Sequence, residues 1–353
     1  MSSVSHTQTT PPSLSVVLSF RNEEAVIPEL VQRLRHVLMG EVETGHLKWY
    51  ELIFVNDVST DNSLALLVEL AKVHDDIRVL NMSRNFGVSP CVMAGLHFSS
   101  GDLVVYMDAD LQDPPEVIPQ MVAAWRADEF VDVVHTKRET RDGESPLKMF
   151  ITRIGYSILH RTSSINLQTE VGDFKLLSRR VVNYLLQLKE KNPFMRGLVV
   201  WVGFNQVTIT YKREARFAGE TKFRVFSLAV INNFFSSALI SFSSLPLQLA
   251  SILGSISSIL SLILIVYVLL EKLQGRNLPG WTAIMVTVLF IGGVQLLSIG
   301  VLGLYVSNIF QEAKGRPLYI VRDTFGFDNE QIDPVTSEMI PNRKFKREKT
   351  TNQ

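Results

Sequence analysis

The sequence predicts an α/β domain with a mainly parallel sheet, followed by two helices that cross a membrane. The first observation is that strand-like and helix-like patterns alternate up to about residue 136. Strands that alternate with helices form parallel sheets covered on both faces. The second is that two long stretches late in the chain lack charged residues. Each stretch exceeds the roughly 20 apolar residues that a helix needs to cross a bilayer.

Four short apolar runs, rich in β-branched residues, are predicted to be strands of this sheet. They are "LSVVLSF" (14–20), "ELIFVN" (51–56), "IRVLNM" (77–82) and "LVVYM" (103–107). Between them the apolar residues recur at helical spacing, which predicts helices over 25–39, 63–73 and 90–99.

The membrane prediction comes from the two uncharged stretches, 225–270 and 277–311. The first is too long for one crossing, and Pro246 divides it, so the predicted spans are 247–270 and 281–309. The alternative is a pair of buried helices in a soluble core. It is disfavoured because soluble helices rarely run this long without charge.

Charge around the hairpin predicts its orientation. The N-terminal segment is polar and lacks the apolar core of a signal peptide, and basic residues flank the hairpin on both sides. This excess predicts an integral membrane protein whose α/β domain and both termini are cytoplasmic. The predicted organisation is a disordered N-terminus (1–13), the α/β domain (14–222), an amphipathic helix in the membrane interface (223–243), the transmembrane hairpin (244–311) and a C-terminal segment with its tail (312–353).

Composition limits the partners. Lysine plus arginine number 35 and aspartate plus glutamate 35, so no global field favours nucleic acid. The single cysteine, Cys91, cannot form an internal disulfide and has no metal-ligand spacing, which is consistent with a reducing compartment. Four glycines of the second span allow close helix packing and leave room for a homo-oligomer; they are Gly292, Gly293, Gly300 and Gly303.

Polar side chains follow all four predicted strands. In chain order they are Asn22 and Glu23, then Asp57, then Arg84, then Asp108 and Asp110. Ligands of open parallel sheets bind at the carboxyl ends of the strands, so these groups are predicted to share one crevice. The alternative is that loops are simply polar. It explains any single loop, but it does not explain carboxylates or an Arg–Asn pair after each strand.

The residues also limit the kind of ligand. No G-x-G-x-x-G follows the first strand and no G-x-x-x-x-G-K-[ST] occurs, so the glycine-rich phosphate loops are missing. A divalent metal held by Asp108 and Asp110 would neutralise phosphate instead, because Mg²⁺ binds one or two carboxylates together with substrate phosphates. In an extended D-x-D both carboxylates point the same way. Asp113 is expected to cap the helix that opens at Pro114 rather than to bind metal.

Seven ordered motifs resemble a known family. They are "SFRNEE" (19–24), "VNDVSTDNS" (55–63), "RNFGVSP" (84–90), "DADLQDPPE" (108–116), "GDFKLLSRR" (172–180), "MRGLVVWVGF" (195–204) and "KREARFAGETKF" (212–223). Together they resemble the inverting, GT-A-fold glycosyltransferases of family 2. The strongest resemblance is to the branch that uses polyprenyl phosphates, the dolichol-phosphate mannose synthases and bactoprenol glucosyltransferases. It extends over about residues 14–325.

This resemblance implies a role for each matching residue. It implies nucleotide contacts for Asn22 and Glu23, base or ribose contacts for Asp57, metal and diphosphate contacts for Asp108, Asp110 and Gln112, and a catalytic role for Asp110 and Asp173. Arg84 is interpreted either as a diphosphate contact or as a surface pair. Two motifs depart from the family, which usually has P-x-Y-N-E where this chain has "SFRNE", and D-D where it has Asn56 and Asp57. The second departure leaves base selectivity open.

The acceptor implied by the resemblance is a lipid phosphate. A phosphate monoester, with a second pKa of about 6, is largely dianionic at neutral pH and needs cations more than a base. Arg213, Arg216 and Lys222 are therefore predicted to bind it, although the positive-inside rule alone also explains basic residues there.

The predicted function is inverting transfer of one sugar to a polyprenyl phosphate, undecaprenyl or dolichyl, at the cytoplasmic face. The sugar is expected to be a hexose such as glucose, the donor a UDP-sugar in preference to a GDP-sugar, and the cofactor Mg²⁺ or Mn²⁺. A processive polysaccharide synthase is the second interpretation, but the chain lacks a Q-x-x-R-W motif and further spans. A non-catalytic membrane adaptor that retains the nucleotide-binding fold is the third.

Overall fold

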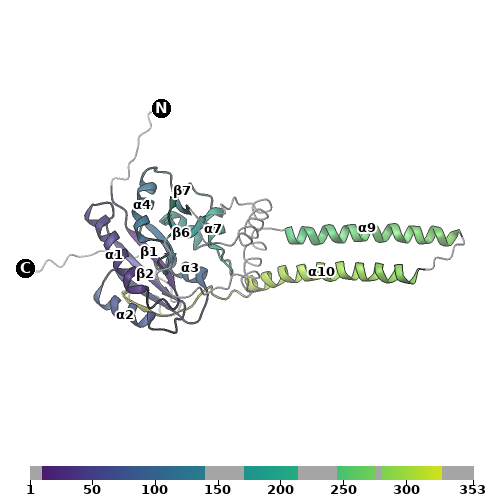
Figure 1. Ribbon diagram of the computed structural model, residues 1–353, viewed down its shortest axis with the longest axis horizontal. Helices are drawn as coiled ribbons and strands as arrows, with labels where there is room; N and C mark the ends of the chain where they lie inside the picture. The colour runs from purple at the N-terminus through teal and green to yellow at the C-terminus, as the bar shows by residue number, and fades with distance from the viewer. Residues whose placement is uncertain (1–9, 140–170, 214–244, 275–279, 328–353) are drawn as a thin grey trace, which may run out of the picture. The chain divides into compact units, whose positions relative to one another are not determined.

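The computed structural model describes residues 10–139, 171–213, 245–274 and 280–327. These residues fall into two units (Figure 1). One is the α/β unit, which includes the chain from Pro317 onward. The other contains the two long helices, and each unit is described by itself.

The described strands of the α/β unit form one sheet in the order β7-β5-β6-β4-β1-β2-β3-β8. Their bounds are β1 Leu14–Phe20, β2 Tyr50–Asn56, β3 Ile77–Met82, β4 Leu103–Asp108, β5 Val133–Arg138, β6 Val171–Ser178, β7 Gln206–Tyr211 and β8 Val321–Phe325. The four predicted strands are therefore confirmed as β1 to β4, each within one residue of its predicted bounds.

Helices cover both faces of the sheet (Figure 1). They are α1 Ile27–Glu43, α2 Ser63–Val73, α3 Val88–Phe98, the 3₁₀ turn η1 Pro115–Val117, α4 Ile118–Arg126, α6 Arg179–Leu185 and α7 Met195–Trp201. Successive residues of β1 point to opposite faces. Leu18 shares a buried cluster with Leu30 of α1, whereas Val17 faces α3. A Cβ at Gly95 would lie 2.2 Å from Val17 Cγ1, so only glycine lets α3 pack this close to β1.

The directions of the strands decide which strand ends lie at the same end of the sheet. β1 pairs parallel with β2 and β4, β2 with β3, and β5 with β7, whereas β6 and β8 pair antiparallel with their neighbours. The carboxyl ends of β1 to β5 and β7 therefore lie at the same end of the sheet, which we call the carboxyl end. The amino ends of β6 and β8 also lie there. Residues after β4, at the start of β6 and after β7 all meet there, although they are far apart in sequence.

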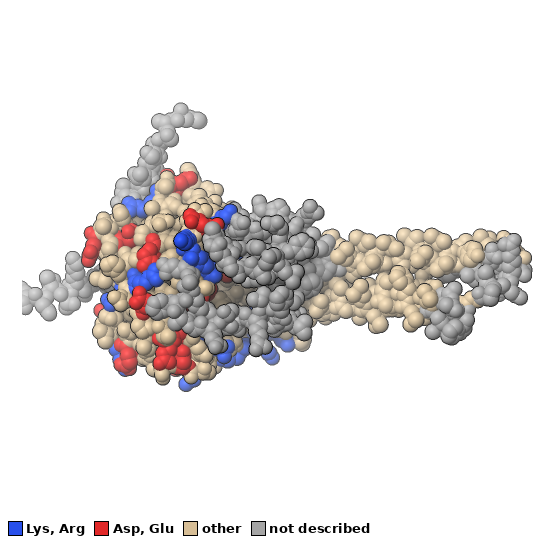
Figure 2. Space-filling view, in the orientation of Figure 1, with Lys and Arg blue, Asp and Glu red and all other residues tan. Residues whose placement is uncertain are grey.

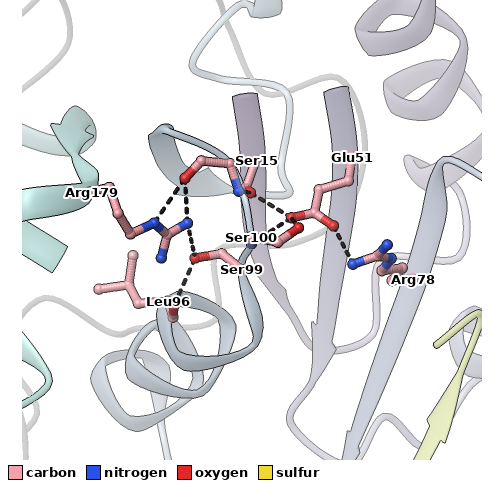
Figure 3. A network of polar contacts seen from close by, with 8 residues as sticks. Ser15, Glu51, Arg78, Leu96, Ser99, Ser100 and Arg179 are labelled. Carbon is pink, nitrogen blue, oxygen red and sulfur yellow. Dashed lines mark hydrogen bonds and ion pairs between the residues drawn. The ribbon is translucent and has the colours of Figure 1, made fainter. Parts of the chain in front are cut away.

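A buried polar network lies at the opposite end of the sheet, where the amino ends of the central strands meet (Figure 3). Glu51 Oε1 accepts from Ser15 Oγ at 2.5 Å and from Ser100 N at 2.8 Å, and Glu51 also forms an ion pair with Arg78. Arg179 Nε donates to the Gly101 carbonyl at 2.8 Å, and Gly101 N donates to Ser15 Oγ. The network ties the amino ends of β1, β2 and β3 to the segment before β4.

The second unit contains the helices α9 Leu245–Leu273 and α10 Trp281–Ala313. Over Leu247–Leu264 and Val286–Ala313 they are long and apolar enough to cross a membrane. Only 11% and 0% of these segments is buried, which contradicts the alternative of two buried helices in a soluble core. Figure 2 shows most of the length of both helices in tan, without the charged side chains that mark the α/β unit.

Several predictions fall on other parts of the chain. The amphipathic helix 223–243, the first nine residues and the tail from 328 lie outside the described residues. Within the described part, β8 was not predicted: 312–353 was expected to form a C-terminal segment, but Val321–Phe325 joins the sheet of the α/β unit beside β3.

Candidate active site

The loops after β1 and β2 are held together by hydrogen bonds. The Asn22 backbone N–H donates to Ser59 Oγ at 3.0 Å, and Thr60 N donates to Asn22 Oδ1 at 2.7 Å. Glu23 N donates to Ser63 Oγ at 2.9 Å, and Glu23 is 8% exposed. The structure thus brings both residues that were predicted to contact the nucleotide against the loop after β2.

Asp57 connects the loops after β2 and β3. Its carboxylate accepts from Phe86 N at 2.7 Å and from Gly87 N at 3.0 Å. Burial, followed by the neighbouring Asp57, raises the pKa of the Cys91 thiol, so Cys91 stays protonated at neutral pH. Asp57 is 7% exposed, so its carboxylate is buried where it meets the loop after β3.

Arg84 lies on the third loop in a different environment. Its guanidinium carbon lies 4.0 Å from the centroid of the Phe86 ring, and Nη1 donates to the Asn85 carbonyl at 3.2 Å. The side chain is exposed. These contacts keep Arg84 within its own loop and do not decide between the diphosphate and surface interpretations.

Left-handed backbone marks three of these loops. In the described part of the chain, the non-glycine residues with positive φ are Asn22 at 54°, Val58 at 55° and Leu111 at 56°. They follow β1, β2 and β4. A β-branched residue such as Val58 is disfavoured there, and strained residues of this kind cost on the order of 1–3 kcal/mol and cluster at functional sites.

Four carboxylates gather around the end of β4. Burial, followed by the charges of Asp173, Asp110 and Asp113, raises the pKa of Asp108 to about 7, while Arg213 opposes this rise. Asp110 is 8% exposed, and its Oδ1 accepts from Gln112 N at 3.1 Å. The predicted D-x-D pair is therefore assembled in a site with excess negative charge.

Asp113 does not cap a helix, which corrects the prediction. The 3₁₀ turn begins at Pro115 with Pro114 at the N-cap position and no side-chain cap. Asp113 is 2% exposed and instead accepts a hydrogen bond from Tyr211 and one from Arg213 Nε at 3.2 Å. A carboxylate buried to this degree requires such donors, and the end of β7 supplies them because β7 runs parallel to β4.

Asp173 lies at the start of β6 and binds Arg196 of α7. Arg196 Nε lies 3.0 Å from each carboxylate oxygen, and Nη2 lies 2.8 Å from Oδ2. Arg196 was not among the predicted site residues, although it belongs to the quoted motif "MRGLVVWVGF". The sequence did contain a signal for Arg196, because an arginine inside an otherwise apolar helical segment indicates a specific partner.

Lys175 lies below Asp173 on the same face of β6. It is 1% exposed and pairs in register with Tyr106 on β4 and His135 on β5. Burial lowers the pKa of Lys175 to about 7, with Asp173 raising it and Arg196 lowering it. The Tyr106 hydroxyl is buried without a hydrogen-bond partner among the described residues. Ionisable groups thus extend from the acidic cluster into the sheet.

The predicted lipid-phosphate residues are only partly described. Arg213 lies beside the acidic cluster through its bond to Asp113, and its side chain is 24% exposed. Arg216 and Lys222 lie outside the described residues.

The acidic cluster has the chemistry to hold a divalent cation. Within the ranges that the structure describes, no group of three or more His, Cys, Asp or Glu side chains is arranged to hold a metal ion by itself. Mg²⁺ and Mn²⁺ need no such cage when a substrate supplies phosphate oxygens. Asp108 and Asp110 offer oxygen ligands. Burial and then the neighbouring carboxylates raise the pKa of Asp108, and a cation would relieve the repulsion among these carboxylates.

Comparison with known proteins gives the family. The profile of glycosyl transferase family 2 matches residues 15–186. A glycosyltransferase of Synechocystis sp. is 40% identical over 316 residues, which cover 89% of this chain and 96% of that protein. The chain belongs to glycosyl transferase family 2. The bactoprenol glucosyl transferase of Shigella phage SfV is 36% identical over 313 residues, 88% of this chain and 98% of that relative.

The family assignment agrees with the fold. The mainly parallel sheet is that of the GT-A fold of glycosyl transferase family 2, and two helices long enough to cross a membrane follow it. Among solved structures, glucosyl-3-phosphoglycerate synthase from Mycobacterium tuberculosis in complex with Mg²⁺ and uridine-diphosphate is 19% identical, with a TM-score of 0.39. The match covers 64% of this chain and 79% of that one, and is a distant likeness.

Proposed function

We propose that this glycosyltransferase transfers one sugar from a nucleotide-sugar to a polyprenyl phosphate at the cytoplasmic face of a membrane. The sugar is a hexose such as glucose, the donor is a UDP-sugar, and the reaction inverts the anomeric centre. Both termini lie in the cytoplasm. Relatives named bactoprenol glucosyl transferase, similar over most of the chain, support the lipid acceptor.

The observation that carries the proposal is the acidic cluster at the end of β4. Four carboxylates meet there, and burial together with their mutual repulsion raises the pKa of Asp108. A site of this charge favours a cation bound together with the diphosphate of a donor. A divalent metal bound at Asp108 and Asp110, with Gln112 beside them, would supply electrostatic stabilisation of the departing diphosphate.

The loops after β1, β2 and β3 are proposed to hold the nucleoside. Asn22, Glu23 and Asp57 line neighbouring strand ends, and their hydrogen bonds join the three loops before any ligand binds. Preorganised loops reduce the ordering that donor binding requires. Arg84, beside Asp57 on the third loop, is assigned to the diphosphate.

The acceptor is proposed to bind on the Arg213 side of the cluster. A phosphate acceptor needs cations, and Arg213 with Arg216 and Lys222 is assigned that role. Because a dianionic phosphate needs no general base, Asp173 is proposed to orient a sugar hydroxyl and to hold Arg196 toward the reacting groups. Attack by the acceptor oxygen in a single displacement inverts the sugar.

A transfer assay tests this function. Purified protein in lipid vesicles is mixed with undecaprenyl phosphate, Mn²⁺ and a panel of radiolabelled UDP- and GDP-sugars. The proposal predicts label in the organic extract as a single-sugar lipid with inverted anomeric configuration. Polymeric product would indicate a processive synthase, and absence of turnover with every donor would indicate a non-catalytic protein. Asp110→Asn is the matched inactive control.

A further inference from the structure

A chain of side-chain hydrogen bonds connects β8 to the loops after β1 and β2. We name it the amide relay: Asp323, Asn81, Asn56 and Ser59. Asn81 Nδ2 donates to Asp323 Oδ2 at 2.8 Å, and Asn56 Nδ2 donates to Asn81 Oδ1 at 2.9 Å. Asn56 Oδ1 then accepts from Ser59 N at 3.0 Å and from Ser59 Oγ at 2.7 Å.

The two ends of the amide relay fix the direction of every bond in it. The Asp323 carboxylate can only accept, so Asn81 must present its amide nitrogen to it. Asn81 then offers its oxygen to Asn56. The Ser59 backbone N–H can only donate, so Asn56 must present its oxygen there. Asn56 is 1% and Asn81 6% exposed, so a reversed bond would leave buried groups facing like groups.

The amide relay ends at the most strained loop of the site. The bonds from Ser59 to Asn56 close a turn around Val58, whose φ of 55° is unfavourable for a β-branched residue. Asp57, beside Val58, holds the loop after β3. Ser59 Oγ in turn accepts from Asn22 N. The relay therefore stabilises the conformation that sets Asp57 and Asn22 relative to each other.

The strand that carries Asp323 is fixed at several points. Ser83 N donates to the Ile320 carbonyl at 2.9 Å, and Tyr319 hydrogen-bonds His97 Nδ1 of α3 at 2.6 Å. The β3–β8 register shifts between Asn81 and Met82. Such a bulge redirects a side chain.

We propose that Asp323 is a positioning residue for donor binding, although it follows the transmembrane hairpin in sequence. Through Asn81 and Asn56 it sets the orientation of the loop at 57–60. The inference rests on the proposed function in one respect, namely that this loop holds the donor nucleotide. It also gives Asn56 a role: where the family usually has a first aspartate, this chain has a buried donor to Asn81, so Asn56 does not face the base.

Reversal of the relay tests this inference. In Asn56→Asp, residue 56 can no longer donate to Asn81. If Asn81 turns its amide to meet the new carboxylate, its oxygen then faces the Asp323 carboxylate. In the double variant Asn56→Asp/Asp323→Asn, every group is paired again: the bonds that join residue 56 to Asn81 and Asn81 to residue 323 are reversed, and residue 56 still accepts from Ser59. Asp323→Asn alone keeps an acceptor for Asn81, so it is the mild single variant. Asn56→Asp/Asp75→Asn is the control with the same net charge, since Asp75 is an exposed residue outside the relay.

The measurement is the affinity for UDP with Mn²⁺, by titration calorimetry on the full-length protein, together with KM for the UDP-sugar and kcat. We expect Asn56→Asp to weaken UDP binding and raise KM by about tenfold, with a smaller change in kcat. Asp323→Asn should change either value by less than about threefold, and the double variant should return to within about threefold of wild type. The control variant Asn56→Asp/Asp75→Asn should bind UDP as weakly as Asn56→Asp does.

Two results would overturn the inference. One is a double variant that binds UDP no more tightly than Asn56→Asp. The other is rescue of the melting temperature without rescue of UDP affinity, which would make the amide relay purely structural. Wild-type protein that binds no nucleotide would instead refute the proposed function, whereas binding without rescue refutes the relay alone. Calorimetry needs no acceptor, so an error about the lipid leaves the test intact.

Discussion

Arg196 on α7 holds Asp173 on β6 with two guanidinium nitrogens, one of them within 3.0 Å of both carboxylate oxygens. The pair lies near Asp108, because after burial the negative charge of Asp173 contributes most to the raised pKa of Asp108. A side chain held in this way is oriented before any ligand binds. Arg196 is therefore a positioning residue for the carboxylate that the sequence predicted to be catalytic.

Removal of this pair should affect turnover more than binding. Arg196→Ala leaves Asp173 free to rotate, and we expect kcat to fall by about 10- to 100-fold with less than about threefold change in KM for the donor. Steady-state kinetics of lipid-linked sugar formation measures both. Arg196→Lys keeps the charge but not the two-nitrogen geometry, so its kcat should lie between those of Arg196→Ala and the wild type. A kcat for Arg196→Ala equal to wild type would show that the pair has no role in transfer.

Metal affinity should depend on pH through Asp108. Its carboxyl group must lose a proton before it binds a cation, and its pKa is about 7 in the metal-free site. Mn²⁺ affinity should therefore rise by about tenfold per pH unit below 7 and level off above it. Calorimetric or paramagnetic titration between pH 5.5 and 8.5 measures this. Asp108→Asn should bind weakly without that slope, and a flat wild-type profile would contradict the assignment.

The same group should lower the stability of metal-free protein as pH rises. The pKa of Asp108 is raised in the folded state from 3.8 to about 7, so its contribution to stability is complete below pH 3.8. It is lost progressively as pH rises through 7. Melting temperatures with and without Mn²⁺ should accordingly diverge most above pH 7.

Lys175 provides a separate pH test, of stability rather than activity. Its pKa falls from 10.5 to about 7 on folding, so burial of the charged amine destabilises the protein most at and below pH 7, and less toward pH 10.5. Lys175→Met should raise the melting temperature more at pH 6 than at pH 9. Lys72→Met, on an exposed side chain, is the control and should show no such difference. An equal shift at both pH values would argue against a titrating Lys175.

The polar network around Glu51, at the amino ends of the central strands, should matter for folding and not for catalysis. Glu51→Ala leaves Arg78 buried without its partner, and loss of one member of a buried pair costs about 3–5 kcal/mol. Chemical denaturation measures this loss, while KM of the remaining folded enzyme for the donor should be unchanged. Glu69→Ala removes an exposed pair with Lys72 and should cost less than about 1 kcal/mol. A changed KM for the donor in Glu51→Ala would mean that this network affects donor binding at the other end of the sheet.

Local sequence patterns predicted the central sheet well, since β1 to β4 are continuous apolar runs that end at polar residues. The short strand β8 was missed because "VRDTF" has little apolar character and is itself an edge strand that pairs only with β3, so its placement depends on tertiary contacts.

The site was predicted in part. The apolar run before Asp108 and Asp110 predicted their place at the end of a strand, and the structure has them there, because neighbours in sequence set that place. Arg196 and the partners of Asp113 could not be inferred in this way. Arg196 reaches this end of the sheet through its bonds to Asp173 on antiparallel β6, and parallel β7 brings the partners of Asp113 there from about 100 residues away, as the hydrogen bonds from Tyr211 and Arg213 to Asp113 show. The capping role predicted for Asp113 failed for the same reason.

Titration of UDP into wild-type and Asp110→Asn protein, with Mn²⁺ and again with EDTA, tests the central claim most directly. The account predicts that wild-type protein binds UDP at least about tenfold more tightly with Mn²⁺, and that Asp110→Asn loses this gain and all transfer activity while its melting temperature and membrane insertion are preserved. Equal UDP affinity with EDTA, or full transfer by Asp110→Asn, would contradict a cation held at the end of β4.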